Sequence, residues 1–480
     1  MSNDKPERLN AKKEENFSEW FTQIITKSEL ISYSKVSGCH VLRPRAFHFW
    51  EEFKGYFNKE IKKRGVENTY FPMLIPENLL QKEAEHVEGF SPEVAWVTHS
   101  GNSKLNERLA IRPTSETIMY DFYKDWIRSH KDLPLKLHQW CNIVRWEFNN
   151  PTPFLRSREF LWQEGHSAFS NKEEADEEVR DILSLYAKSF KELFAIPSLE
   201  GEKSKKETFA GADYSLSVET FLPSGKGIQM ATSHHLGQNF SKAFDISFTD
   251  ENSEEKFAYQ NSWGTSTRAI GTMIITHSDN KGLIMPPRIA YPQAVIVPIL
   301  FEDSKKEVLD VSKSLKEKLD DDVLVKLDDR DSYSPGWKFN EWEMKGVPIR
   351  IEIGPRDIKN NKAVLVRRDT GEKTSVEMDE VKEKVNELLE EIHNNLYNRA
   401  EKFIEKNTVE PSDFEEFKEA ISNGKMVKAK WCTTEECEDH IKHESGGAKS
   451  LNMTFEKDIE GKCIYCDKKA KRNTYFAKSY

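Results

Sequence analysis

Residues 136–170, KLHQWCNIVRWEFNNPTPFLRSREFLWQEGHSAFS, constrain the fold more than any other stretch of the chain. Two segments dense in β-branched and aromatic residues, Lys136 to Phe148 and Glu159 to Ser170, flank a loop with two asparagines and two prolines at 149–153. This pattern predicts two long antiparallel strands joined by a loop. The predicted hairpin is therefore the expected centre of an antiparallel sheet.

The hairpin carries charges of both signs among aromatic residues. The charged or titratable residues are Arg145, Glu147, Arg156, Arg158, Glu159, Glu164 and His166, and the residues expected to be buried beside them are Trp140, Val144, Trp146, Phe148, Phe160 and Trp162. Burying such charges without partners costs free energy. A ligand that carries both signs supplies those partners. A structural sheet with charges facing solvent is the alternative that the hairpin alone leaves open.

Three motifs in order identify a resemblance. Arg-Trp-Glu at 145–147, a loop with Arg156 and a second strand resemble motif 2 of the class II aminoacyl-tRNA synthetases; RPTSET at 112–117 precedes it and SWGTSTR at 262–268 follows it. From about Trp20 to Tyr480 the chain resembles the prolyl-tRNA synthetases of the archaeal and eukaryotic type. The resemblance implies a proline–tRNA ligase, which forms prolyl-adenylate and pyrophosphate from L-proline and ATP and then transfers the prolyl group to the 3′-terminal adenosine of tRNA(Pro).

The expected fold is multidomain, α+β and α/β. We expect a flexible tail at 1–16, a class II catalytic domain built on an antiparallel sheet at 17–283, an α/β anticodon-binding domain at 284–407 and a small zinc-binding α/β domain at 408–480. MPPRIAYP, at 285–292, indicates the linker between the first two domains. In the second domain we expect strands at Ala294–Ile299, Val323–Leu327, Ile349–Ile353 and Lys362–Arg367, and helices at Ser304–Leu319, Pro335–Lys345 and Val376–Lys406.

A predicted helix from Arg43 to Arg64, followed by a strand from Glu67 to Leu74 that contains Pro72, resembles motif 1. In this family motif 1 forms the subunit interface, so the resemblance implies a homodimer. Proline within a strand fits an edge or an end. An ordinary amphipathic helix that covers a sheet is the alternative.

The resemblance implies a set of residues that bind proline, and the chemistry of their side chains suits that role. A strand that turns at Pro113 brings Thr114 and Glu116 to one side, and an acceptor hydroxyl and a carboxylate fit the two N–H donors of a secondary ammonium. Read alone, Ser115-Glu116 is an ordinary helix start and Phe209 an ordinary core residue. The complete set implied for proline is Thr114, Glu116, Arg145, Trp162, Glu164, His166, Phe209, His234 and Ser266. His235 is expected to be structural.

Arginines are expected to perform the activation. As a carboxylate attacks the α-phosphorus of ATP, negative charge accumulates and fixed cations stabilise it. We assign this catalytic role to Arg145 and to Arg268, which follows a predicted polar turn around Gly264. The resemblance implies ATP binding by Arg145, Glu147, Arg156, Gln229, Thr232 and Arg268, with Mg²⁺. The chain has no P-loop sequence.

The residues expected to bind the anticodon lie in FNEWEMKGVPIRIEIGPRD and are Phe339, Glu343, Arg350 and Arg356. An acid and an arginine can read splayed single-stranded bases.

Four cysteines have the C-x4-C and C-x2-C spacing typical of structural zinc, with two disulfides as the alternative; they are Cys432, Cys437, Cys463 and Cys466. Cys39 and Cys141 have no such partner pattern.

Composition limits the partners. The net charge of -10 predicts that any tRNA contact depends on local basic clusters rather than on the whole surface. No apolar run is long enough to span a membrane and the first residues lack a signal-peptide core, so we expect a cytoplasmic protein. Only about 60 residues separate His166 from Gln229, too few for the editing domain of bacterial prolyl enzymes. A noncatalytic tRNA-binding paralogue and a synthetase for another amino acid, such as threonine, are the other hypotheses.

Overall fold

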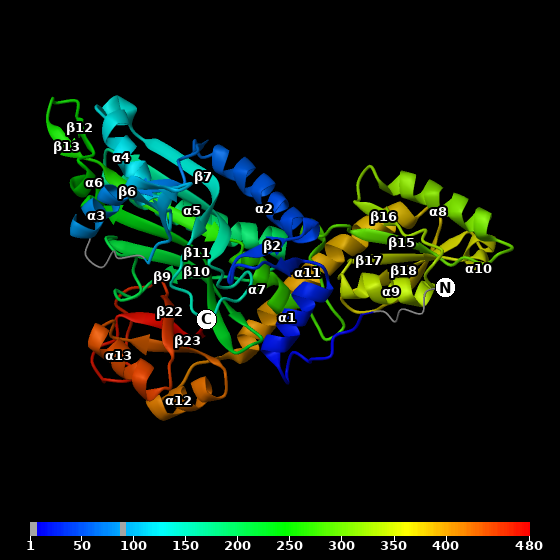
Figure 1. Ribbon diagram of the computed structural model, residues 1–480. Helices are drawn as coiled ribbons and strands as arrows, with labels where there is room; N and C mark the ends of the chain where they lie inside the picture. Colours follow the sequence, from blue (N-terminus) through cyan, green and yellow to red (C-terminus); the bar gives the residue numbers. More distant parts are fainter. Residues whose placement is uncertain (1–6, 87–92) are drawn as a thin grey trace.

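The computed structural model describes residues 7–86 and 93–480. Within these residues the largest sheet has eleven strands and runs across the centre of the molecule (Figure 1). Its strands are, in spatial order, β20 (Thr408–Val409), β21 (Met426–Trp431), β23 (Arg472–Ser479), β22 (Lys449–Met453), β9 (Leu199–Glu202), β10 (Tyr214–Leu222), β11 (Lys226–Gly237), β14 (Tyr259–Ser266), β8 (Glu159–Phe169), β7 (Leu135–Val144) and β3 (Glu67–Asn68). The pairs from β21 to β7 are antiparallel, which confirms the predicted central hairpin, although β7 ends at Val144 rather than at the predicted Phe148.

One face of this sheet is covered by α2 (Pro44–Lys62), α5 (Lys172–Phe194) and α7 (Arg268–His277). The side chain of Asn171 accepts from Glu174 N at the start of α5, where acidic residues favour the positive end of the helix. Aromatic rings fill the space between helices and sheet: Phe57 stacks on Tyr186 with centroids 5.0 Å apart, and Phe53 meets Trp140 edge-on. This packing leaves the opposite face of the central strands for a pocket.

At one end, the opposite face is covered by α4 (Glu116–Trp126), α6 (Asn239–Phe244), α3 (Glu77–His86) and a smaller sheet of β4 (Leu74–Pro76), β6 (Ser103–Ile111) and β5 (Trp96–Ser100). The strand predicted at Glu67–Leu74 is wrong: β3 and β4 belong to different sheets and Pro72 lies between them. Proline has no N–H to donate to a ladder, which is consistent with the break at this point. Short hairpins complete the region at β1 (Ile31–Tyr33) with β2 (His40–Leu42) and at β12 (Ser247–Thr249) with β13 (Glu255–Phe257).

Residues 294–407 form a second unit around five strands, β16 (Val325–Leu327), β15 (Ala294–Pro298), β17 (Ile349–Ile353), β18 (Lys362–Arg367) and β19 (Lys373–Glu377) in spatial order. Its helices are α8 (Lys305–Leu319), α9 (Pro335–Met344), α10 (Pro355–Lys359) and α11 (Val381–Asn407). The predicted limits of β17 and β18 are confirmed, whereas β19 was missed and α11 begins later than predicted. From this unit α11 returns to the large sheet, where Arg399 donates to the carbonyl of His277 at 2.9 Å (Figure 1).

The last part of the chain extends the large sheet rather than forming a sheet of its own. Its helices are α12 (Phe414–Ser422) and α13 (Glu435–Glu444). β22 meets β9 through Met453 and Glu202, and β23 runs parallel to the start of β11. Tyr480 donates its hydroxyl to Ser224 Oγ at 3.0 Å, so the end of the chain lies beside the turn between β10 and β11 (Figure 1).

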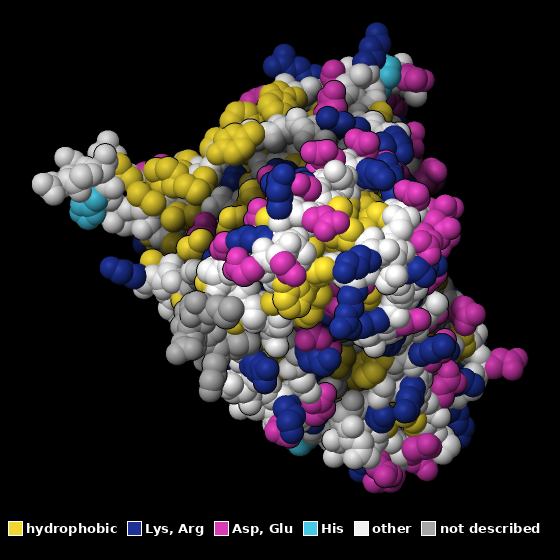
Figure 2. Space-filling model, turned by 90° about the vertical axis from the view of Figure 1, so that its right-hand side faces the viewer, with side chains coloured by type: hydrophobic (Ala, Val, Ile, Leu, Met, Phe, Trp, Pro, Cys, Tyr) yellow, Lys and Arg dark blue, Asp and Glu magenta, His cyan; other side chains and the backbone are white. Residues whose placement is uncertain are grey.

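Residues 1–6 of the predicted flexible tail lie outside the described residues. Residues 7–16 differ from a free tail, because Lys13 donates to the carbonyl of Ser278 at 2.9 Å and its backbone N–H donates to Asn280 Oδ1 at 2.8 Å. They precede α1 (Phe17–Lys27), in which Trp20, Phe21, Ile24 and Ile25 are buried. In the described ranges, no helix is both long and apolar enough to cross a membrane. Figure 2 shows Lys and Arg side chains interspersed with Asp and Glu over the face that it views.

Candidate active site

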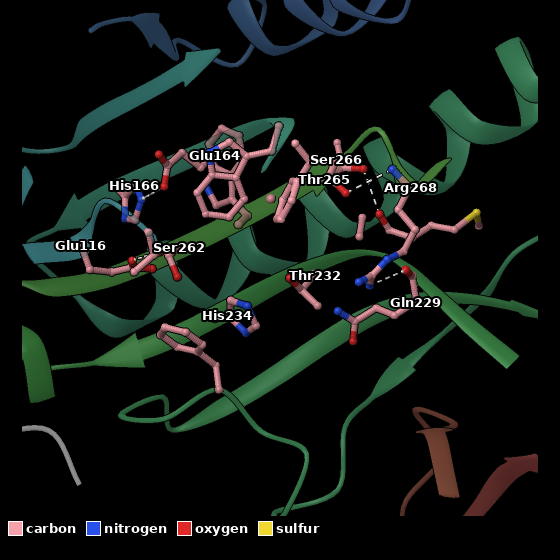
Figure 3. A pocket seen from close by; sticks show the side chains of 18 of the residues that line it. Glu116, Glu164, His166, Gln229, Thr232, His234, Ser262, Thr265, Ser266 and Arg268 are labelled. Atoms are coloured by element: carbon pink, nitrogen blue, oxygen red, sulfur yellow. Dashed lines mark hydrogen bonds and ion pairs between the residues drawn. The ribbon is translucent and has the colours of Figure 1, made fainter. Parts of the chain in front are cut away.

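Three neighbouring strands, β8, β14 and β11, form the floor of a pocket (Figure 3). Their register aligns residues into rows: Glu164 is opposite Gly264 and Gly264 opposite Thr232, while His166 is opposite Ser262 and Ser262 opposite His234. Alternate residues of a strand point to one face, so both rows face the pocket while Gln163 faces the helices and accepts a hydrogen bond from Tyr186.

Gly264 lies at the middle of its row, in the centre of β14. The turn predicted around this glycine is wrong, since β14 continues through it to Ser266. A Cβ at Gly264 would approach the carbonyl oxygen of Gln163 to 3.1 Å and the ring of Trp162 to about 4 Å. Glycine within a strand often marks close approach by a ligand. Here it keeps the pocket floor open between Glu164 and Thr232.

One end of the pocket is acidic (Figure 3). A carboxylate oxygen of Glu116, one of Glu164 and a ring nitrogen of His166 lie within 4.8 Å of one another, and all three residues are buried. Glu164 is held by His166 Nε2 at 3.2 Å and by Gln139 Nε2 at 2.8 Å. Thr114 donates its hydroxyl to Glu116. Ser115, the residue before α4, donates its hydroxyl to Glu164 rather than capping the helix.

At the acidic end, Glu164 and His166 shift each other's pKa. Burial alone raises the pKa of a carboxyl group, but hydrogen bonds from His166, Ser115 and Gln139 and the charge of His166 bring the pKa of Glu164 below its ordinary value. Burial alone lowers the pKa of an imidazole, but the hydrogen bond to Glu164 and the charges of Glu116 and Glu164 raise the pKa of His166. Two carboxyl groups beside one imidazole give this end more acidic than basic groups, which favours a cationic ligand.

The other end is basic. Arg145 follows β7, with its guanidinium carbon 5.6 Å from the ring centre of Trp162 and 5.8 Å from that of Phe160, and its Nε–H donates to the carbonyl of Pro113 at 3.1 Å. Arg268 begins α7 and donates from Nε to the carbonyl of Leu155 at 3.0 Å. Burial lowers the pKa of both arginines, that of Arg268 to about 10 with the charges of Arg145 and Arg156 adding to the effect. Two cations held this close to each other favour an anionic ligand.

A loop wall faces the floor. The ring of Phe209 stacks on His234 with centroids 4.8 Å apart, and the backbone N–H of Phe209 donates to Ser215 Oγ at 3.0 Å. Burial, with the charges of His166 and Lys203, lowers the pKa of His234 to about 3, so this imidazole is neutral. His234 Nδ1 and Ser215 Oγ form a hydrogen bond of 2.7 Å. His235 stacks on Tyr214 and is fully buried, as the structural role that we predicted requires.

The pocket has a volume of about 280 Å³ and brings together most of the residues named from the sequence. Those that line it are Thr114, Glu116, Arg145, Trp162, Glu164, His166, Phe209, Gln229, Thr232, His234, Ser266 and Arg268. Glu147 and Arg156 do not line it. Both are exposed, with Arg156 positioned over the ring of Phe148 at 4.6 Å; Trp146, which we expected to be buried, is 38% exposed.

Sequence reasoning missed other residues of the walls, namely Phe160, Lys203, Glu207, Met230, Ala231, Ser262, Trp263, Gly264 and Thr265. Ser262 could have been found, because it is two and four residues before Gly264 and Ser266 on one strand. Lys203 and Glu207 come from the loop between β9 and β10, and no local pattern indicates that this loop reaches the pocket.

The four residues predicted to read an anticodon lie on the second unit. Arg350 places its guanidinium 4.2 Å from the ring centre of Phe339 and pairs with Glu352 at 2.8 Å. Glu343 pairs with Lys281 at 3.2 Å, and Arg356 is exposed on α10.

The four cysteines predicted to bind zinc come together. Their sulfur atoms lie within 4.8 Å of one another, with Cys437 and Cys463 3.6 Å apart and Cys432 and Cys466 3.5 Å apart. Tetrahedral zinc with Zn–S bonds of about 2.3 Å requires sulfurs about 3.8 Å apart, whereas a disulfide requires about 2 Å. The donor set and its spacing therefore fit a tetrahedral thiolate site, and all four cysteines are free thiols.

Comparison with known proteins matches all three parts of the chain. Residues 96–277 match the family described as tRNA synthetase class II core domain (G, H, P, S and T), residues 293–388 match the anticodon binding domain, and residues 414–480 match the prolyl-tRNA synthetase C-terminal family.

Named relatives align along nearly the whole chain. A proline–tRNA ligase named as cytoplasmic from Arabidopsis thaliana is 49% identical over 98% of this chain and 91% of its own length. A proline–tRNA ligase from Alkaliphilus oremlandii is 49% identical over 97% of both chains. A bifunctional glutamate/proline–tRNA ligase from Cricetulus griseus is 50% identical over 98% of this chain, which spans about a third of that larger protein (33%).

Proposed function

The chain belongs to the class II prolyl-tRNA synthetases of the archaeal and eukaryotic type, and from this premise we propose that it is a proline–tRNA ligase. It activates L-proline with ATP to prolyl-adenylate and pyrophosphate, and then transfers the prolyl group to the 3′-terminal adenosine of tRNA(Pro). The observation that carries this proposal is a single pocket with an acidic end and a basic end.

The acidic end is assigned to the ammonium of proline. Glu116 and Thr114 accept its two N–H groups, and the two carboxyl groups of Glu116 and Glu164 beside the single imidazole of His166 favour the positive ammonium. The ring of proline fits against aromatic and small side chains. The residues assigned to proline are Thr114, Glu116, Arg145, Trp162, Glu164, His166, Phe209, His234 and Ser266.

The basic end is assigned to the carboxylate and the phosphates. The carboxylate oxygen of proline forms a bond to the α-phosphorus of ATP while the bond from that phosphorus to pyrophosphate breaks. Arg145 has a planar fork whose outer N–H groups can bind the carboxylate and an α-phosphate oxygen together, which aligns the two for in-line attack. Arg268 stabilises the negative charge on the departing phosphates. A ribose hydroxyl of tRNA then attacks the prolyl carbonyl carbon, and AMP leaves.

The remaining contacts of ATP are assigned to Glu147, Arg156, Gln229 and Thr232. Because Glu147 and Arg156 lie outside the pocket walls on an exposed loop, this assignment requires the loop to close on the adenine and the triphosphate. Mg²⁺ neutralises charge on the phosphates, with the amide oxygen of Gln229 as one protein contact.

The other parts of the chain serve the tRNA and the fold. We assign residues 17–283 to catalysis, 284–407 to anticodon binding through Phe339, Glu343, Arg350 and Arg356, and 408–480 to a structural zinc site at Cys432, Cys437, Cys463 and Cys466. Four protein ligands leave no open position on the metal, so its role is to hold the fold. The cytoplasm is the proposed location, which the name of the Arabidopsis relative supports.

We assign the homodimer interface to an apolar surface between β3 and β4 and on α4. The exposed fractions are 73% for Tyr70 and 46% for Trp126, and Met73, Leu74 and Phe122 are exposed beside them. An exposed apolar patch of this kind is typical of an interaction surface. Sedimentation of the parent as a dimer and of Leu74→Glu as a monomer is the expected result, and a monomeric parent would refute the assignment.

ATP–pyrophosphate exchange with each of the twenty amino acids tests the proposed activity. Proline alone should give strong exchange, and Glu116→Gln should raise the KM for proline at least about tenfold, since a neutral amide replaces the carboxylate that accepts from the ammonium. Stronger exchange with another amino acid than with proline, or exchange that needs no amino acid, would refute the proposal.

A further inference from the structure

Residues 202–207, which we call the tether, connect the catalytic pocket to the C-terminal part of the chain. Every residue of the tether bonds to a residue beyond position 434. The pairs are Glu202 with Arg472 at 2.6 Å, Lys203 with the carbonyl of Leu451 at 2.6 Å, Ser204 with Glu438 at 2.9 Å, Lys205 with Glu435 at 2.9 Å, Lys206 with Asp439, and Glu207 with Lys449 at 3.5 Å.

Two of these anchors are buried. Glu438 is 7% exposed and accepts from the hydroxyls of Ser204 and Ser450. Lys203 is 8% exposed and also pairs with Glu219 at 3.2 Å. Lys205, by contrast, has 84% of its side chain exposed. Hydrogen bonds to buried charged groups stabilise far more than exposed ion pairs do, so the buried anchors decide where the tether lies.

The tether leads directly into the loop wall of the pocket. Within it, the carbonyl of Ser204 accepts from Glu207 N at 3.1 Å and from Thr208 Oγ1 at 2.9 Å. Phe209 follows at once, and its backbone N–H is held by Ser215, which also bonds to His234. Lys203, Glu207 and Phe209 all line the pocket. When Ser204 is held in place, the first residues of the turn that leads to Phe209 are therefore held as well.

Residues 203–213 form neither helix nor strand between β9 and β10. Backbone hydrogen bonds hold the two ends of the segment, from Lys203 N to the carbonyl of Ser215 and from Asp213 N to that of His235, both at 2.8 Å. Between these ends, the side chain of Ser204 is an additional anchor for the first half of the segment. Without the anchor at Ser204 the segment gains conformations, and ordering it again around a substrate costs conformational entropy. Phe209 stacks on His234, in the same row as His166 at the acidic end, so this cost falls on the ligand bound at that end.

We propose that Glu438, in the C-terminal part of the chain, is a positioning residue for proline recognition, acting through Ser204 on the loop that carries Phe209. This inference rests on the proposed function, since it takes proline as the ligand of the acidic end. Glu438 does not line the pocket and touches no reacting atom. Its effect should therefore appear in the KM for proline and not in that for ATP.

The test compares Glu438→Gln and Ser204→Ala with the parent enzyme. Each should raise the KM for proline in ATP–pyrophosphate exchange about tenfold, which is about 1.4 kcal/mol, and leave the KM for ATP within about twofold. The double variant should raise the KM by less than the product of the two single effects, because both variants act on the bond between Ser204 and Glu438. Ser204→Ala also removes the hydroxyl that accepts from Glu207 N at 3.3 Å, and Glu438→Gln also alters the bond with Ser450. Lys205→Met, which removes an exposed pair of the same tether, is the matched control and should match the parent.

Hydrogen exchange of the purified proteins supplies a reading that does not depend on catalysis. The amides of 203–213 should exchange faster in Glu438→Gln and Ser204→Ala, while those of β10 and β11 should not change. Faster exchange with an unchanged KM for proline overturns the inference, as does an equal rise in both KM values. A parent without proline-dependent activity refutes the proposed function instead, and exchange still reports whether Glu438 holds the segment.

Discussion

Replacing Arg145 with lysine separates the shape of its guanidinium from its charge. The Nε–H of Arg145 is committed to the carbonyl of Pro113, and its cation lies over the rings of Phe160 and Trp162. The outer N–H groups are therefore the part that can bind the carboxylate of proline and the α-phosphate together. A lysine keeps one positive charge, but as a point charge it cannot hold two anions in a fixed plane.

The expected size of the effect follows from the bonds lost. A hydrogen bond to a charged group contributes about 1.5 to 3 kcal/mol, so loss of one of the two charged contacts lowers kcat/KM for proline roughly 10- to 150-fold. Arg145→Ala loses both contacts, about 3 to 6 kcal/mol, and should lower kcat/KM by at least roughly 150-fold. Steady-state ATP–pyrophosphate exchange measures both values.

Arg158 supplies the matched control. It lies on the same hairpin, with its guanidinium 4.8 Å from the ring centre of Trp146 and its Nε–H donated to the carbonyl of Phe148 at 3.2 Å, but it does not line the pocket. Arg158→Lys should retain activity within about threefold, since only the hairpin surface changes. If Arg145→Lys also stays within threefold, or if both variants lose activity equally, the assignment of Arg145 is wrong.

Three further predictions concern the metal, pH and selectivity. Elemental analysis should find about one zinc per chain, and Cys463→Ser should lower that zinc content. The same variant should speed hydrogen exchange at 203–213, because α13 carries both Cys437 and Glu438. Full zinc retention in Cys463→Ser would contradict the four-cysteine site. The raised pKa of His166 means that its protonation stabilises the fold below its unfolded-state pKa and that this contribution disappears as pH rises through the folded-state pKa. The loss in unfolding free energy caused by His166→Gln should therefore be larger at about pH 6 than at about pH 8 in urea titrations, and an equal or opposite difference would contradict the proposed pairing with Glu164. Alanine should be activated detectably, because each missing methylene is worth only about 1 to 3 kcal/mol of discrimination; efficient hydrolysis of alanyl-tRNA(Pro) by the purified protein would show a clearing activity that we do not expect.

The sequence predicts an element well where local preference and tertiary packing agree. β17 and β18 are short β-branched runs bounded by turn residues, and their predicted limits hold. β19 was missed because its charged residues, at the edge of the sheet, merge with the helical pattern that follows it. Pro72 was recognised as a strand end, but the sequence does not show that the strands on its two sides belong to different sheets.

The pocket shows the same limit. Glu164, His166 and Trp162 could be placed together because alternation along one strand is a local property. Gly264 was misread, since a glycine among polar residues usually indicates a turn and here it opens the centre of a strand for a ligand. Lys203 and Glu207 line the pocket and also bond to the C-terminal part of the chain, and contacts over such separations leave no periodic pattern.

The tether also affects how the protein is made. Lys203 and the carbonyl that it binds, that of Leu451, are separated by 248 residues. At translation rates of about 5 to 20 residues per second, roughly 10 to 50 s pass between synthesis of the two. During that interval the nascent chain presents the outer edge of β9 and a row of charges without their C-terminal partners, and other strands can add to an uncovered edge of this kind. Chaperone capture of ribosome-bound chains should therefore be concentrated between completion of β11 and emergence of β22.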